Sequence, residues 1–403
     1  MESTPAPTLP ATPHVHFTVP VPQIHAAFAR VPDPRRRQGT RFPRPAILTL
    51  AVAAILANHC SLLAIAEWGS AQTDAIKRAL GFPKGRTPHA STLQRLFRRL
   101  DPEALALAVS EVFDPQTPGE VPARGSEGVA IDGKAQRGRL LHETTRSHPV
   151  HSVSAFSHTV GTVLAQVALD QQAHEGELTA ATTLIEQLDW EGRVLTGDAL
   201  YCQRRLCAQV VEAGGDYLFL VDANQPSLQA DIEQLFAPPP PPAPGHAPIT
   251  LEEQQARTVS KGHGRLEVRE IRVSSELADY LDWPYVAQVF QVTRSWTHKG
   301  GPKQEVKLGI TSLPQGVASA ERLLTLKRGH WGIENRLHYV LDETLREDRS
   351  TLHGGHGPDI MAILRRTAVS ALRRAGFAQI AARLRHNSRH PEDALRVLGL
   401  ALP

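Results

Sequence analysis

Three acidic residues in separate parts of the chain could together hold divalent metal ions. Asp132 lies in VAIDGKAQRGR, Asp198 in RVLTGDALYCQ and Glu334 in KRGHWGIENRLHYVLDETLRED. Carboxylate oxygens suit Mg²⁺ or Mn²⁺, and two such ions can stabilise the charge that develops when a phosphodiester is cut or joined. An Asp before Gly is by itself typical of a turn, and a helical Glu is usually a surface charge. Only the combination, if the fold joins all three, predicts a site for phosphodiester chemistry.

The segments around the two aspartates predict the element order βββαβαβ, which is a mixed α/β sheet. Short β-branched runs separated by turn-forming residues favour strands, and glycines after a periodic run favour the end of a helix. The predicted strands are 128–133, 151–158, 161–170, 193–201 and 216–222, and the predicted helices are 177–190 and 202–215. Both aspartates fall at strand ends, where a sheet exposes side chains to ligands. This placement favours a functional role over a packing role.

The region before this sheet predicts a helical module. An apolar, Ala-rich run over 45–69 has helical character and is broken near Asn58, and a short helix then ends at Gly81. The next predicted helix has Ser91 or Thr92 as its N-cap and an apolar stripe on one side. Its other side carries three arginines, Arg95, Arg98 and Arg99. These could lie along DNA, and the alternative is an ordinary core helix with a solvated charged side.

The residue pattern of the sequence changes again between Asp198 and Glu334. A proline-rich stretch, APPPPPAPGHAP, predicts an exposed spacer, and the alternating segments behind it predict a β-rich insertion. Helical character resumes after Ser319, a candidate N-cap, and Gly329 and Gly332 are expected to bend or break the run. At helical spacing, Glu334 shares one face with Leu337, His338 and Leu341. A carboxylate on an apolar face needs neutralisation, which a metal could provide.

Charge and composition are consistent with a folded protein that grips a polyanion. The net charge is +3, but residues 30–100 hold 13 Lys and Arg against 3 Asp and Glu, and residues 360–403 hold 8 against 2. Basic flanks around an acidic centre suit DNA binding outside and metal chemistry within, although solvated arginine faces would look the same. The chain has neither a long uninterrupted apolar run nor a signal peptide, so we expect no membrane partner and a cytoplasmic location. The three cysteines are expected to be reduced and mostly buried.

The motifs quoted above, with several others in the same order, resemble one family. DPRRRQGTRFP, SLLAIAEWG, IDGKAQRGR, GELTAATTLIEQL, TGDALYCQ, GGDYLFLVDANQ, KGHGRLEVRE and RGHWGIENRLHYVLDETLRED are similar to the DDE insertion-sequence transposases of the H-repeat-associated group. The resemblance runs from about residue 24 to residue 376. It implies a ribonuclease-H-like catalytic domain in which Asp132, Asp198 and Glu334 are both the catalytic and the metal-binding triad.

The resemblance also implies a domain organisation. We expect a flexible tail (1–22), a helical accessory or DNA-binding domain (23–115) and a basic C-terminal segment (377–403). The catalytic domain is expected in two parts, 125–221 and 316–376, separated by the β-rich insertion with its polyproline loop (222–315). The implied activity is binding to the terminal inverted repeats of an insertion sequence, followed by metal-dependent cleavage and strand transfer. The implied partners are double-stranded DNA, at element ends and target, and a second copy of the chain on that DNA.

The sequence departs from the family around the glutamate. Related transposases with such an insertion carry a Tyr-Arg-Glu-Lys pattern, and here Lys327, His330 and Leu341 stand at the other three positions. His330 could contact a phosphate or orient the carboxylate, and Lys327 or Arg328 could supply the missing positive charge. Trp331 could stack on a flipped base or be a buried core residue. Asp222, where relatives tend to have lysine, could weaken a DNA contact.

Further basic residues are candidates for DNA contact. Lys134 and Arg137, with Arg139, follow Asp132 closely and could meet the cut strand, or they could form a solvated loop. Lys261 and His263, with Arg265, form a Gly-spaced basic turn that suits contact with backbone phosphates.

Other classes of function remain as alternatives. Zinc binding through His353 and His356, or through His330 with Glu334, lacks a convincing second ligand pair. The absence of GxxxxGK[ST] and GxGxxG motifs disfavours a nucleotide cofactor. A domesticated or decayed transposase that binds DNA without cutting it, and a stand-alone metal-dependent nuclease, are the two rivals of a transposase.

Overall fold

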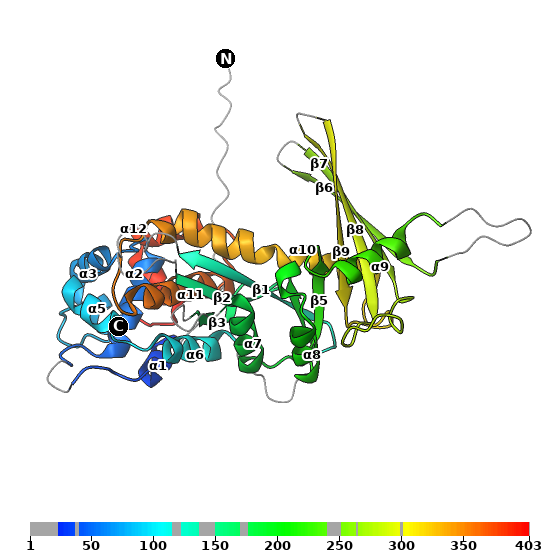
Figure 1. Cartoon of the computed structure of the whole chain (residues 1–403). Helices are drawn as coiled ribbons and strands as arrows, with labels where there is room; N and C mark the ends of the chain where they lie inside the picture. Colours follow the sequence, from blue (N-terminus) through cyan, green and yellow to red (C-terminus); the bar gives the residue numbers. More distant parts are fainter. Residues whose placement is uncertain are drawn as a thin grey trace, which may run out of the picture.

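One mixed sheet of nine strands runs through the molecule in the order β3-β2-β1-β4-β5-β9-β8-β7-β6 (Figure 1). The computed structural model describes residues 23–36, 40–114, 122–136, 150–169, 176–239, 251–262, 265–298 and 301–402. The first five strands in the chain are β1 (Glu127–Gln136), β2 (Val150–Ser157), β3 (Val163–Ala168), β4 (Arg193–Gly197) and β5 (Asp216–Val221). Helices α7 (Glu177–Gln187) and α8 (Arg204–Glu212) connect β3 to β4 and β4 to β5.

The pairing within this half defines the fold class. Strand β1 is antiparallel to β2 and β2 to β3, whereas β1, β4 and β5 run parallel. Parallel neighbours require a crossover, which α7 and α8 supply here. This order and direction are those of a ribonuclease-H-like sheet, and the predicted fold class is confirmed.

The β-rich region extends the same sheet. Strands β6 (Gln254–Gly262), β7 (Arg265–Ser274), β8 (Gln288–His298) and β9 (Gly301–Thr311) form an antiparallel meander, and β9 pairs with β5. Helix α9 (Pro226–Phe236) leads into it. Backbone hydrogen bonding is therefore continuous from β3 to β6.

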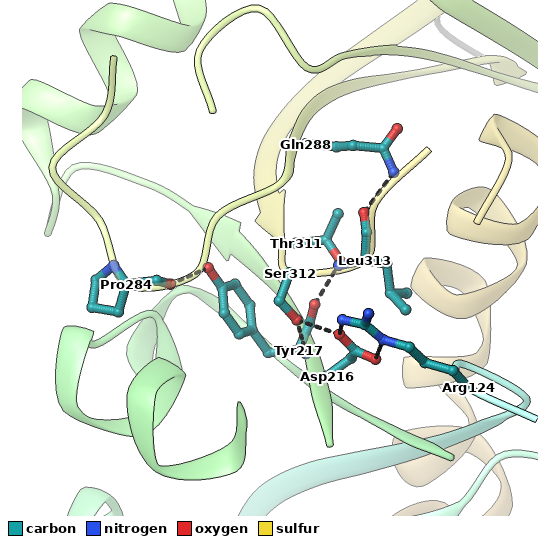
Figure 2. A network of polar contacts seen from close by, with 8 residues as sticks. All are labelled: Arg124, Asp216, Tyr217, Pro284, Gln288, Thr311, Ser312 and Leu313. Carbon is teal, nitrogen blue, oxygen red and sulfur yellow. Dashed lines mark hydrogen bonds and ion pairs between the residues drawn. The ribbon is translucent and has the colours of Figure 1, made fainter. Parts of the chain in front are cut away.

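A buried polar network holds β5 against the β9 end of the meander (Figure 2). The Asp216 carboxylate, 1% exposed, accepts two hydrogen bonds from Arg124 at 2.8 and 2.9 Å and one from Ser312 Oγ at 2.8 Å. Tyr217 donates its backbone N–H to Ser312 Oγ and its hydroxyl to the Pro284 carbonyl at 2.8 Å. Because a buried carboxylate must be satisfied, this network fixes how the meander continues the sheet.

Helices from both ends of the chain share one apolar core. The N-terminal helices are α1 (Gln23–Arg30), α2 (Arg44–Leu56), α3 (Leu62–Ala71), α4 (Asp74–Ala79), α5 (Ala90–Phe97) and α6 (Pro102–Phe113). The C-terminal helices are α11 (Gly357–Arg374), α12 (Ile380–Arg389) and α13 (Pro391–Val397). Helix α2 is buried from Ala46 to Leu56, and α11, α12 and α13 all contact it. The basic C-terminal segment therefore packs onto the N-terminal helices (Figure 1).

The helix boundaries agree with the sequence in most places. The break near Asn58 and the stop at Gly81 both occur, with left-handed φ values of 68° and 93°. The predicted N-cap of α5 is wrong: His89, not Ser91 or Thr92, caps the helix by accepting the Ser91 N–H. An imidazole nitrogen can replace the usual hydroxyl or carboxylate acceptor.

Some sequence expectations fall outside the described residues. These are the tail 1–22, Arg137 and Arg139, His263, and most of the proline-rich stretch. The predicted domain boundaries stay predictions. All three cysteines are free thiols, and Cys202 and Cys207 are buried. No helix in the described part of the chain is both long and apolar enough to cross a membrane.

Candidate metal centre

Asp132 lies within β1, opposite Ser154 of β2, and the strand continues to Gln136. The predicted position of Asp132 at a strand end is therefore wrong, because pairing with β2 extends β1 beyond it. Its Oδ1 accepts the Gly133 N–H at 2.9 Å, which fixes the carboxylate against the strand. Its Oδ2 lies 3.4 Å from Nδ1 of His338. The side chain is 25% exposed, so it remains accessible to a ligand.

Asp198 directly follows β4, which is parallel to β1 and adjacent to it. It caps the short 3-10 helix Ala199–Tyr201 by accepting the Leu200 N–H at 2.9 Å. The loop after β5 holds this helix, since Asn224 Nδ2 donates to the Ala199 carbonyl at 2.7 Å. The parallel register pairs Ala130 with Thr196, and Asp132 and Asp198 each follow two residues later, which brings Asp198 to the side of Asp132.

Glu334 begins the π-helical segment η5 (Glu334–His338), and η6 (Val340–Thr344) continues it toward the C-terminus. Helix α10 (Ala320–His330) precedes these segments, capped by Ser319 as expected. The expected apolar face is only partly present: Leu337 and Leu341 are fully buried, but Glu334 is exposed. The wider π-helical turn separates positions that α-helical spacing would place on one face.

The three carboxylates lie close enough for their charges to interact. Partial burial raises the pKa of Glu334, and the negative charges of Asp132 and Asp198 raise that pKa further, whereas His338 lowers it. Mutual repulsion among carboxylates is the electrostatic condition that a bound cation relieves.

The three carboxylates have the chemistry that a divalent metal needs, although their oxygen atoms do not surround an ion position in this structure. Three carboxylates from a strand, a strand end and a helix supply hard oxygen donors. Among the described residues, no three His, Cys, Asp or Glu side chains stand together closely enough to hold an ion. Backbone N–H groups orient one oxygen of Asp132 and one of Asp198. The second oxygen of Asp132 lies beside His338, so a metal there would share this oxygen with the imidazole or displace it.

A chain of polar side chains behind the carboxylates was not predicted from sequence. His158 Nε2 lies 3.0 Å from Thr196 Oγ1, which lies 3.4 Å from Nδ1 of His330. Burial lowers the pKa of His158 to about 3, with further lowering by the nearby positive groups, so this imidazole is neutral. Burial also lowers the pKa of His330, while Asp132 and Asp198 raise it. His330 therefore borders the acidic site, as the sequence suggested.

Two glycines make room for the His158 ring. A Cβ at Gly128 of β1 or at Gly329 of α10 would lie 2.2 Å from His158 Nδ1. No side chain fits at that distance, so the ring occupies a slot between the strand and the helix. The motif RGHWG contains Gly329, but nothing in the sequence indicates that His158 packs against this glycine.

Three further side chains at the site were missed. The Tyr201 hydroxyl donates to Glu177 Oε2 at 3.1 Å, and burial, Glu177 and Asp132 together raise the pKa of Tyr201. Nε2 of His338 is buried without a hydrogen-bond partner among the described residues. The spacing of four residues between Glu334 and His338 is visible in the sequence. Glu177 lies in the motif GELTAATTLIEQL, but nothing else in the sequence marks it as a site residue.

Lys134 is not a free cation at the site. It is 6% exposed, donates to Asp342 Oδ1 at 2.6 Å and lies 4.0 Å from Asp348 Oδ1. It ties β1 to the segment after Glu334. A direct contact with DNA would require this pair to open.

The remaining predicted DNA contacts are spread over the molecule. Trp331 is 50% exposed, so the buried-core interpretation of this residue is wrong. Arg328 is exposed near the site, whereas burial lowers the pKa of Lys327 beside the meander. Lys261 is exposed on β6 at one end of the molecule, and α5 lies at the other (Figure 1). Arg95, Arg98 and Arg99 are exposed there, as the apolar stripe predicted.

Glu347, the candidate zinc ligand His353 and Asp222 each have structural contacts of their own. Glu347 is buried against Arg365 and Arg366, at 3.8 and 3.4 Å. His353 Nδ1 lies 3.0 Å from the Thr351 carbonyl oxygen. Asp222, the residue expected to weaken a DNA contact, lies 3.5 Å from Lys307.

Comparison with known proteins agrees with this architecture. The family model described as "Transposase DDE domain" matches residues 123–370, and a model described as "DDE_Tnp_1-associated" matches residues 25–111. The protein named "H repeat-associated putative transposase YhhI" of Escherichia coli strain K12 is 27% identical over 85% of this chain and 88% of its own length. An "Uncharacterized protein in dhlA 3'region" of Xanthobacter autotrophicus is 30% identical over 72% of this chain and 95% of its own.

A solved structure gives a weaker likeness. The cryo-EM structure of the piggyBac transposase synaptic complex with hairpin DNA aligns over 96% of this chain and 80% of its own, at 8% identity and a TM-score of 0.41. The fold assignment rests on strand order and direction instead. Because the transposase model spans more than half of the residues, this chain belongs to the transposase DDE domain family.

Proposed function

We propose that this protein is a DNA transposase that binds the terminal inverted repeats of its own element, cuts at the ends and joins them to target DNA. The observation that supports it is the meeting of Asp132, Asp198 and Glu334, from three separate elements, within range of one another's charge. Family membership supports the transposase class. The cleavage and joining chemistry, and action in the cytoplasm, belong to the proposal.

The three carboxylates would hold Mg²⁺ or Mn²⁺, two ions per site. Bound there, the metal would polarise the phosphate and lower the pKa of an attacking water or 3′-hydroxyl. The chain's own residues position the carboxylates: the Gly133 and Leu200 N–H groups orient the two aspartates, and His330 and His338 border them. Both element ends must be processed together, so we expect a dimer on DNA.

The test is a plasmid assay with Asp198→Asn as the central variant. The plasmid carries the inverted repeats found in the DNA that flanks the gene. We expect the wild-type protein with Mg²⁺ to nick or join this plasmid, and Asp198→Asn to abolish both products while repeat binding in a mobility-shift assay is retained. Glu343→Gln removes one exposed carboxylate downstream of Glu334 and serves as the charge-matched control, with activity close to wild type.

Each failure has a distinct meaning. Equal activity of Asp198→Asn and wild type would overturn the triad. Repeat binding by the wild type without any cleavage would favour the domesticated DNA-binding alternative. Cleavage without joined products would favour the stand-alone nuclease.

A further inference from the structure

A groove of about 810 Å³ lies between the N-terminal helices and the segment that follows Glu334. The N-terminal ends of α3 and α5 form one wall, residues 344–346 and 349–353 form another, and Met361 and Arg365 of α11 contribute to the remainder. This volume falls within the roughly 300–1,000 Å³ typical of ligand sites.

The groove is positively charged. Arg346, Arg349 and Arg365 line it, and its lining residues include no Asp or Glu. Arg346 and Arg349 are exposed, and neither side chain has a hydrogen bond or ion pair within the described part of the chain. Burial raises the pKa of Cys60, another lining residue, but the charges of Arg365 and Arg346 lower it.

Two helices direct their N-terminal ends at the same groove. Ser61 caps α3 by accepting the Ala64 N–H at 3.1 Å, and this leaves the Leu62 and Leu63 N–H groups without an intrahelical acceptor. Ala90 and Ser91 begin α5 and also line the groove, and because His89 accepts the Ser91 N–H, only the Ala90 N–H is left without an intrahelical acceptor at this end. Free N–H groups and the helix dipole make such ends favourable for phosphate.

A buried arginine lacks a full set of partners at this place. Arg365 is 3% exposed, and its Nη2 donates to the Cys60 carbonyl at 3.2 Å. Its Nε has no hydrogen-bond partner among the described residues. Its acidic neighbour Glu347 is shared with Arg366, so the buried cluster of three side chains keeps one positive charge. This uncompensated positive charge at the groove favours an anionic ligand.

The groove lining is close in sequence to a residue that contacts the strand carrying Asp132. Lys134, two residues after Asp132, lies 4.0 Å from Asp348 Oδ1, and Arg349, the next residue, lines the groove. The groove lining therefore begins one residue from an ion-pair partner of Lys134, on the strand that carries Asp132. Leu63, Leu352 and Met361 give the groove an apolar part that suits deoxyribose and bases.

We propose that this groove binds the sugar-phosphate backbone of one DNA strand beside the cleavage site, with phosphates at the ends of α3 and α5 and at the arginines. This proposal rests on the proposed function, and it adds a second DNA-contact surface to the metal centre. The N-terminal helices would thus take part in holding the strand that the metal centre cuts.

The first experiment measures salt dependence with a fluorescein-labelled duplex that covers one terminal repeat. Each lost phosphate contact lowers the slope of log Kd against log salt by about 0.9. The double variant Arg346→Gln plus Arg349→Gln is therefore expected to lower the slope by about 1–2. The matched control, Arg78→Gln plus Arg205→Gln, removes two exposed arginines outside the groove and is expected to keep the wild-type slope. Circular dichroism checks that both double variants are folded.

The second experiment is photo-crosslinking. Leu63, 57% exposed in the groove, and Leu107, 54% exposed on α6, are each replaced by p-benzoylphenylalanine. We expect a DNA adduct from position 63 and none from position 107. A wild-type slope in the Arg346→Gln plus Arg349→Gln variant, or no adduct at position 63, would overturn the groove proposal while plasmid cleavage still supports the metal site. A wild type that neither binds nor cuts the repeat DNA would overturn both proposals.

Discussion

Replacing Gly329 with alanine tests whether the slot around His158 is as tight as the structure shows. Alanine has the higher helix propensity, so an exposed helical site would gain about 0.5–1 kcal/mol in unfolding free energy. Here the new Cβ would lie 2.2 Å from His158 Nδ1, and Gly128 borders the same nitrogen. The ring cannot retreat easily, because the His158 N–H donates to the Gly128 carbonyl at 2.9 Å and Arg336 donates to the His158 carbonyl at 2.7 Å.

The size of the effect follows from three terms. Overpacking costs about 1–3 kcal/mol, and losing the His158 to Thr196 hydrogen bond costs about 1 kcal/mol. After the gain in propensity, we expect Gly329→Ala to lower the unfolding free energy by about 1–3 kcal/mol. The variant is also expected to lose DNA cleavage, since displacing His158 and Thr196 displaces His330.

Equilibrium urea unfolding, followed by circular dichroism, measures the stability. Gly332→Ala is the matched control, because a Cβ there would lie 3.5 Å from Phe156, an ordinary contact, and stability should be unchanged or slightly higher. In a His158→Ala background the cost of Gly329→Ala should disappear, which a double-mutant cycle detects. A Gly329→Ala protein as stable as wild type, or a cost that persists without His158, would refute the reasoning.

Three further outcomes are expected. Because burial lowers the pKa of His158 to about 3, the unfolded state binds more protons at any pH below the ordinary histidine pKa of 6.5, and stability should fall as pH drops. By pH 5 this amounts to about 2 kcal/mol, measured as the difference in pH dependence between wild type and His158→Gln. Asp216→Asn should lower stability by about 1–3 kcal/mol in urea unfolding, because it leaves the buried Ser312 hydroxyl poorly paired and removes the charge partner of Arg124, and an unchanged midpoint would contradict Figure 2. Lys134→Met should leave Asp342 without its partner and lower the thermal midpoint, and the double variant with Asp342→Asn should recover part of the loss.

Local patterns in the sequence were enough to predict most of the helices and strands. The β-branched runs around Asp132 and Asp198 predicted strands, and the structure has β1 and β4 there. These patterns succeed because alternation and helical periodicity are properties of neighbouring residues. The position of Asp198 at the end of β4 depends on the same short-range information, whereas Asp132 lies inside β1 because that strand runs on to Gln136.

The surroundings of Glu334 could not be predicted in this way. Regular α-helical spacing placed it on an apolar face, but the chain forms π-helical turns that expose it. A π-helical turn is adopted only when tertiary packing compensates for its weaker local geometry. Packing of Leu337 and Leu341 in the core supplies that compensation here.

What the sequence determined by itself is the list of most elements, their order and the position of Asp198 just after a strand. Only the tertiary structure decided which distant side chains meet: His158 between Gly128 and Gly329, Lys134 with Asp342, and Arg349 beside the end of α3. Such meetings depend on contacts between residues far apart in the chain, and no spacing or periodicity encodes them. The metal-ligand types are therefore visible in the amino-acid sequence, whereas the side chains that position them and the groove beside them arise only from packing.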